Sequence, residues 1–244
     1  MSQTVQRAIV IIEALAEQPR TLSEVAQLLG VHRSTALRLL QTLESSGFAR
    51  QRTDGRYAVG THLISIAQQT LDSLDLRELS TPHLRALHAK CGHTIHLAQL
   101  IDDQVIYVDK VDGTEGVRMY SRIGRPASLH ASGVGKAILS QMPREHREQL
   151  LQNTELSHYT AATFSTQEGL RDELERINQR GWAADDGEFE DFINCVAAPV
   201  SNSTGDIIAA ISIAAVKVIA PPSQLRRLVP DLQEQAKNLS RELG

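Results

Sequence analysis

The most constraining feature of this chain is a helix, a glycine turn and a second helix, followed at once by an Asp-Gly hairpin, all within residues 21–59. Thr21 and Glu24 have the spacing of a capping box, which predicts a short helix that ends at Gly30. Apolar residues recur on one face of a second predicted helix, residues 32–45: Ala36, Leu39, Leu40 and Leu43. The same spacing predicts an earlier helix: Ala8, Ile11, Ile12 and Leu15.

The polar face of the second helix carries residue types that bind nucleic acids. Opposite the apolar stripe, and in the first turn, lie short hydrogen-bonding residues and arginines: Arg33, Ser34, Thr35, Arg38 and Gln41. In a helix-turn-helix the N-terminal half of the second helix enters the major groove of DNA. A polar face that only meets water is the competing interpretation of this helix.

The hairpin favours DNA binding over simple solvation. Residues 48–52 and 56–59 alternate as strands around Thr53-Asp54-Gly55, and Asp-Gly is a strong hairpin signal. A hairpin directly after a recognition helix is a wing, and it places Arg50, Arg52 and Arg56 beside a duplex. We therefore predict that residues 1–60 form a winged helix-turn-helix domain, with DNA contacts from seven residues: Arg33, Ser34, Thr35, Arg38, Gln41, Arg52 and Arg56.

The distribution of charge supports this division. The whole chain of 244 residues has a formal charge of −4, but residues 1–60 contain seven arginines against five acidic residues, a balance of +2, and the remainder carries −6. The first lysine is Lys90, and arginine binds phosphates and guanine edges through a planar fork that lysine lacks. Aromatic residues make up only 4%, which argues against base stacking on single strands.

The cysteines and the apolar runs indicate a reduced, aqueous compartment. Cys91 and Cys195 lie far apart, which supports neither a disulfide framework nor a zinc knuckle. The start lacks the basic and apolar regions of a signal peptide, and the longest apolar-rich run, residues 207–216, is about half of a bilayer span. We expect a cytoplasmic protein with no membrane partner.

The remaining residues predict a linker helix, residues 61–75, and a larger domain, residues 76–244. Apolar residues of the helical stretch after Gly60 are expected to pack against a second subunit or against the chain's own larger domain. Strands are predicted at residues 94–101, 105–111, 116–123, 194–200 and 207–215, and helices at 133–142, 144–151, 167–180 and beyond Pro222. This order indicates an α+β domain with a mainly antiparallel sheet that holds a small ligand on one face.

Three stretches together resemble the IclR family of bacterial transcription regulators: residues 34–43, residues 129–139, and residues 181–186 with 194–199 and 210–213. The resemblance implies a repressor with a winged helix, a dimerising linker helix and a GAF-like effector domain that assembles dimers into tetramers. Its partners would be double-stranded operator DNA and a small metabolite, often an organic acid, without a cofactor.

By motif position the resemblance implies six effector-binding residues: Gly133, Val134, Asp185, Ile193, Cys195 and Ser212. Residues 132–135 open a predicted helix, where unpaired N–H groups favour a carboxylate. Two departures from the family pattern, Phe192 and Ala214, replace a glycine and a serine. They predict an effector that is larger or more apolar than a two- or three-carbon keto acid.

Four other interpretations of these residues and of the chain stay open. Cys195 could be a nucleophile with His130 as base and Asp185 as orienting acid, although no spacing supports such a hydrolase-like enzyme. Asp185 and Cys195 with a histidine could hold a metal ion, or the chain could bind DNA without a ligand. Cys195 could equally be a small buried hydrophobe. We expect no catalytic residues and no metal.

Overall fold

The computed structural model describes residues 2–72, 75–114, 119 and 121–243, with backbone alone for residues 68–72 and 75. The chain divides into two compact units, Met1–Ser73 and Leu74–Gly244. Each unit has its own hydrophobic core.

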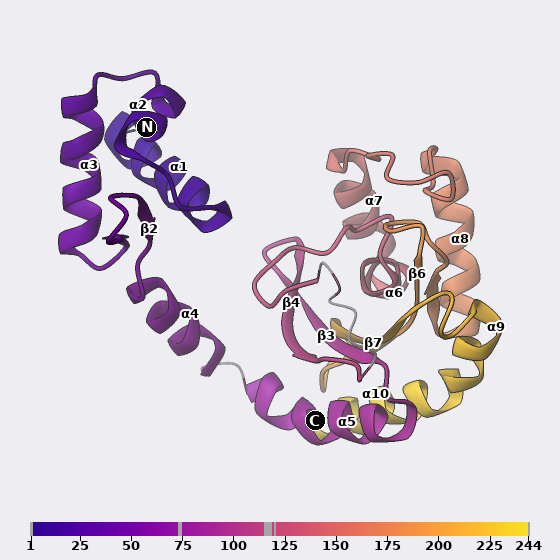
Figure 1. The fold of residues 1–244 in the computed structure, drawn as a ribbon. Coiled ribbons are helices and arrows are strands. Elements are labelled where there is room, and N and C mark those ends of the chain that lie inside the picture. The colour runs from indigo at the N-terminus through magenta and orange to yellow at the C-terminus, as the bar shows by residue number, and fades with distance from the viewer. Residues whose placement is uncertain (1, 73–74, 115–118, 120, 244) are drawn as a thin grey trace. The chain divides into compact units, whose positions relative to one another are not determined.

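The first unit is a helical bundle with a wing (Figure 1). Its elements are α1 (Gln3–Glu17), α2 (Leu22–Leu29), α3 (Arg33–Ser45), β1 (Ala49–Gln51), β2 (Tyr57–Val59) and α4 (His62–Asp72). The predicted capping box is present, because Thr21 Oγ1 accepts from the Glu24 N–H and Glu24 Oε2 accepts from the Thr21 N–H. Gly30 ends α2 in the left-handed region, at φ 60°, which turns the chain into α3. Ile11, Leu15 and Leu40 are buried in the shared core.

The second unit is built on an antiparallel sheet, as predicted. Its elements are α5 (Asp75–Cys91), β3 (Thr94–Ile101), β4 (Gln104–Val111), α6 (Gly133–Gln141), α7 (Arg144–Asn153), α8 (Gln167–Arg180), β5 (Ala183–Asp185), β6 (Ile193–Ser201), β7 (Ile207–Val216), α9 (Pro222–Leu225), a 3-10 turn (Arg226–Leu228) and α10 (Val229–Glu242). The strand order is β4-β3-β7-β6-β5, and every neighbouring pair is antiparallel.

Helices cover both faces of this sheet (Figure 1). α6 packs on one face with α8 behind it, and α5 and α10 pack on the other. Because side chains alternate along a strand, only every second residue reaches the α6 side. On β7 these residues include Ala210, Ser212 and Ala214, and on β6 they include Cys195 and Ala197. The strand period therefore decides which residues face α6.

The predicted strand at residues 116–123 is wrong where the structure describes it. Residues 116–118 and 120 lie outside the described residues, and Met119 and residues 121–123 form no strand. Gly124 turns at φ 84°, and the chain then follows β4 irregularly, with Pro126 in an isolated bridge to Ile106. Proline has no N–H to donate, so Pro126 cannot donate a ladder hydrogen bond to β4.

Two further details of the fold were not anticipated. The short strand β5 has only three residues, too few for a period-2 pattern to stand out. The predicted linker helix and the apolar run after it form two helices, α4 and α5, with residues 73–74 outside the described part of the chain. The other predicted helices and strands are found within two residues of their expected bounds.

Candidate functional site

The exposed face of α3 carries the predicted DNA-contacting residues. Arg33, Ser34, Arg38 and Gln41 are exposed and Thr35 is half-buried, whereas Ala36 and Leu40 on the opposite face are fully buried. His32 caps the helix, and its Nδ1 lies 3.0 Å from Ser34 Oγ. The polar residues therefore lie on solvent while the apolar stripe holds the helix against the core.

The wing presents its arginines to solvent as well. Arg52 and Arg56 are exposed, and Asp54 shapes the turn between them by accepting the Arg56 N–H at 3.1 Å. The same carboxylate lies 3.7 Å from Arg52 Nε, in an exposed ion pair that a phosphate can replace at little cost. Gly55, at φ 79°, supplies the left-handed residue that the hairpin requires.

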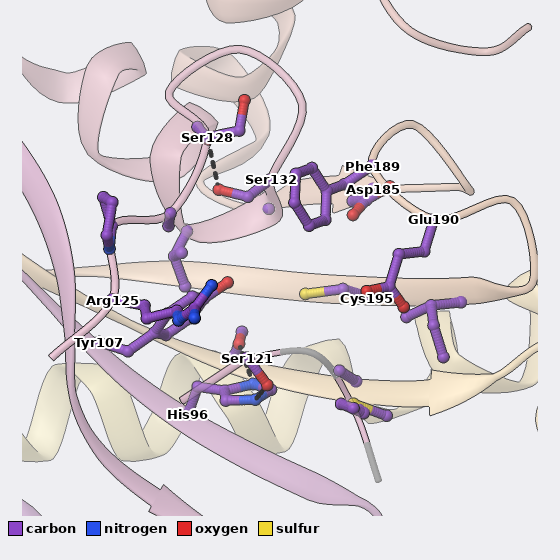
Figure 2. A pocket seen from close by; sticks show the side chains of 18 residues that line it. His96, Tyr107, Ser121, Arg125, Ser128, Ser132, Asp185, Phe189, Glu190 and Cys195 are labelled. Atoms are coloured by element: carbon purple, nitrogen blue, oxygen red, sulfur yellow. Dashed lines mark hydrogen bonds between the residues drawn. The ribbon is translucent and has the colours of Figure 1, made fainter. Parts of the chain in front are cut away.

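A cavity of about 70 Å³ lies between α6 and the sheet of the second unit. All six predicted effector residues line it, together with residues that come from β3, β4 and the loops around α6 (Figure 2). Strand register explains this convergence, because Ser212 pairs with His96, Ala214 pairs with Cys195, and Cys195 pairs with Asp185. Four neighbouring strands thus deliver their side chains to one place.

The N-terminus of α6 forms another wall of the cavity. Ser132 caps this helix, accepting from the Gly135 N–H at 3.0 Å and donating to the Ser128 carbonyl at 2.6 Å. The helix approaches β6 so closely that a Cβ atom on Gly133 would lie 2.8 Å from Cys195 Sγ. A side chain at position 133 would therefore displace the Cys195 sulfur. The first amides of α6 border the cavity, where a helix favours an anion.

A buried cluster of charges holds the loop that covers one side of the cavity. Lys136 is fully buried in α6 and pairs with Glu188, which is itself buried. Burial raises the pKa of Glu188 to about 7 and that of Asp185 to about 6, and the Lys136 cation opposes both shifts. Asp185 Oδ1 accepts the Glu188 N–H at 2.7 Å, and Thr163 donates to the Glu188 carbonyl at 2.6 Å. These contacts position the adjoining Phe189 and Glu190 at the cavity.

Several lining residues were not predicted from the sequence. They share no motif and come from β3, β4 and two loops: His96, Tyr107, Met119, Ser121, Arg125, Phe189 and Glu190. The period-2 pattern of β3 and β4 places His96 and Tyr107 on one face, which is the only signal that could have found them.

The predicted role of Phe192 is wrong. Its side chain is 53% exposed and does not line the cavity, because Ile193, the next residue along β6, points there instead. The aromatic wall comes from Phe189. Ala214 does line the cavity, so a methyl group forms the wall at that position.

The geometry gives no support to nucleophilic catalysis or metal binding. Burial raises the pKa of the Cys195 thiol to about 12, so the thiolate that a nucleophile needs is strongly disfavoured. His130 does not line the cavity, and its Nε2 lies 3.0 Å from the Ser157 carbonyl oxygen. Within the described residues, no three His, Cys, Asp or Glu side chains are arranged to hold a metal ion.

The two units together define a class of protein: an exposed helix-turn-helix with a basic wing, joined to a domain that encloses a small cavity. Residues 4–53 match the IclR helix-turn-helix domain, and residues 68–241 match the family described as bacterial transcriptional regulator IclR C-terminal. Among the helices that the structure describes, none combines the length and apolar content needed to cross a membrane.

Similar proteins agree with these matches. The acetate operon repressor of Salmonella typhimurium is 37% identical over 216 residues, which is 86% of this chain and 79% of the relative. The crystal structure of the Thermotoga maritima IclR has a TM-score of 0.84 at 30% identity, covering 99% of this chain and 98% of that one. An IclR homologue from Microbacterium hydrocarbonoxydans, complexed with 4-hydroxybenzoate, shares the fold with a TM-score of 0.83 at 23% identity, over 98% of both chains.

The chain therefore belongs to the IclR family of bacterial transcription regulators. It is a DNA-binding regulator with a small-molecule effector domain, and not an enzyme, since its named relatives are transcription regulators.

Proposed function

We propose that this protein is a repressor whose affinity for its operator changes when a small organic acid binds the cavity of the second unit. One observation carries the proposal: six residues singled out by motif position, from separate segments of the chain, line a single cavity. A protein that binds DNA without a ligand would have no need of such a cavity. Contact with DNA places the protein in the cytoplasm.

On the DNA side, α3 would lie in the major groove with Arg33, Ser34, Arg38 and Gln41 toward the bases. Their exposure supports this docking, and Thr35, which is half-buried, would contact the edge of the groove. Arg52 and Arg56 of the wing would bind the phosphate backbone or enter the minor groove.

On the effector side, the carboxylate of the acid would accept hydrogen bonds from the amides of Gly133 and Val134 at the start of α6. The aromatic walls, Tyr107 and Phe189, favour a flat or chain-like carbon skeleton over a very small acid. The 4-hydroxybenzoate complex of the Microbacterium homologue is consistent with an aromatic acid. The cavity volume of about 70 Å³ limits the effector to a small molecule.

The protein would act as a dimer or a dimer of dimers on a pseudo-palindromic operator. Exposed apolar side chains in the first unit support self-association: Val5 and Ile9 on α1 are 58% and 51% exposed, and Ile64 on α4 is 66% exposed. α4 would thus be the linker helix that pairs with a second copy. Sedimentation of the full chain measures this state directly.

The effector site is tested with one variant that narrows the cavity and a second variant that widens it again. Gly133→Ala introduces a methyl group against Cys195 Sγ, so we expect effector binding and the effector response in a gel-shift titration to be lost. The double variant Gly133→Ala, Cys195→Ala removes the obstructing sulfur and should recover part of both. Calorimetric titration with glyoxylate, pyruvate and larger carboxylates provides the binding measurement. Tight binding of glyoxylate or pyruvate alone would refute the larger effector.

A further inference from the structure

The floor of the cavity contains a buried histidine between two serines. His96 is 3% exposed, and its two ring nitrogens are both engaged: Nε2 lies 2.7 Å from Ser121 Oγ and Nδ1 lies 3.3 Å from Ser212 Oγ. Both serines line the cavity, whereas Ser132 at the start of α6 lies on the opposite side of it in Figure 2. The serine pair is therefore separate from the helix end that suits a carboxylate.

The charge state of His96 decides what the serines present to a ligand. Burial, reinforced by the nearby Lys110 cation, lowers the pKa of His96 to about 3, while Asp112 opposes that shift. The imidazole is neutral at physiological pH, and a neutral imidazole has one N–H donor and one acceptor nitrogen. One serine must then accept from the ring while the other donates to it, whichever tautomer is present.

The consequence is a matched pair of hydroxyl groups. The serine that accepts from His96 keeps its own O–H to donate to a ligand, and the serine that donates to His96 offers only lone pairs. A ligand hydroxyl, which both donates and accepts, satisfies the two serines together. An ionised carboxylate cannot, because it has no proton to give to the second serine.

The other groups that contact the floor are neutral. Burial raises the pKa of the Cys195 thiol, which therefore stays protonated. Tyr107 packs against the His96 ring at 5.1 Å between centroids, and burial raises the pKa of its phenol, which therefore also stays neutral. Charged residues of both signs line the cavity wall, Asp185 and Glu190 against Arg125, so the neutral serine pair rather than the charge of the wall distinguishes a hydroxyl from a carboxylate.

We infer that His96 is a specificity-determining positioning residue that selects, as effectors, acids with one carboxylate and a hydroxyl group at the far end, and rejects dicarboxylates. This inference rests on the proposed effector site. It adds the chemical class of the ligand and the residue that enforces it.

The test compares matched acids on the full-length protein by calorimetric titration. One set is benzoate, 4-hydroxybenzoate and terephthalate, and the other is butyrate, 4-hydroxybutyrate and succinate. In at least one set we expect the hydroxy acid to bind roughly tenfold more tightly than the parent acid, the size of one buried hydrogen bond, and the diacid to bind most weakly. His96→Leu should abolish the preference for the hydroxyl while the parent acid still binds. His96→Gln, which keeps a donor and an acceptor, should retain it.

Two controls keep the result interpretable. His83→Leu removes another buried histidine, which contacts Gln235 and Glu242 of α10 outside the cavity, and should leave the preference unchanged. Ser121→Ala removes one partner of His96 with little change in volume and should lower the preference even if His96→Leu does not fold. If His96→Leu or Ser121→Ala keeps the preference for the hydroxy acid, or if a diacid binds most tightly, this inference fails while the proposed effector site stands. If no acid of either set binds the wild-type protein, both the proposed effector and this inference fail.

Discussion

The two units place their functional residues in opposite environments. In the first unit the residues proposed to contact DNA are almost all exposed, and the core behind them only holds the helix in place. In the second unit the cavity is lined by buried polar groups, among them His96, Asp185 and Ser212. An exposed polar side chain costs little stability, whereas a buried one must be paired or neutral. Substitutions of these residues in the first unit should therefore change DNA affinity without changing stability. In the second unit they should change effector binding and stability together.

The sharpest test of this contrast is Lys136→Met. Removing a buried cation leaves Glu188 unpaired, so we expect the unfolding free energy of the second unit to fall by about 3 to 5 kcal/mol at pH 8. Denaturant unfolding of the full chain measures it. The double variant Lys136→Met, Glu188→Leu should regain most of the loss. If the single variant is as stable as the wild type, the buried polar groups of the second unit do not contribute to stability as expected.

The pH dependence of the unfolding free energy of Asp185→Asn also tests whether buried polar groups control the stability of the second unit. The expected effect is smaller. The folded pKa of Asp185, about 6, lies above its ordinary value of 3.8, so the folded form holds a proton that the unfolded form releases. Wild-type stability contributed by this group is present below pH 4 and is lost as pH rises to about 6. Relative to wild type, Asp185→Asn should gain about 2 to 3 kcal/mol between pH 4 and pH 7, at about 1.4 kcal/mol per pKa unit. A constant difference across this range would contradict the assignment.

In the first unit Arg38→Ala should act on binding alone. If Arg38 contacts a guanine edge, operator affinity should drop by about 1 to 3 kcal/mol and sequence preference should relax at one position. Gel-shift titrations on operator and mismatched duplexes measure both quantities. The unfolding free energy should stay within roughly 0.5 kcal/mol of wild type, because the side chain is exposed. Loss of stability with unchanged affinity would place Arg38 in a structural role.

Arg56→Ala should give the smallest effect and a different signature. A phosphate contact carries no sequence information, so affinity should weaken similarly for all duplexes. The slope of log affinity against log salt should flatten by about one unit, which titrations at several salt concentrations measure. Arg50→Ala, on strand β1 of the wing, is the matched variant against which this change in slope is compared. If Arg38→Ala and Arg56→Ala both leave operator affinity unchanged, the proposed docking fails.

Prediction from the sequence was more accurate for the first unit than for the second. The capping box at Thr21, the turn at Gly30 and the Asp-Gly hairpin are local, and each forms as predicted because neighbouring residues alone decide it. In the second unit the helices and long strands were predicted from the spacing of their apolar residues. The predicted strand at residues 116–123 was not found in its described part, Met119 and residues 121–123, because apolar spacing alone does not decide whether a segment pairs with a neighbouring strand.

For the cavity, motif position located Gly133, Asp185, Cys195 and Ser212, but it misplaced Phe192 and missed His96. Whether a residue beside a strand points inward depends on where the strand begins, and a shift of one residue reverses the answer. Ile193 begins β6 and points inward, so Phe192 points outward.

The arginine-rich winged helix-turn-helix and the separate antiparallel α+β domain follow from the amino-acid sequence, since capping, turn chemistry and hydrophobic period act over a few residues. Which buried polar groups meet depends on the packing of distant segments. His96 and Ser212 are 116 residues apart along the chain, and Lys136 and Glu188 are 52 apart. Register across the sheet and the close approach of α6 bring these partners together, and no local pattern encodes either.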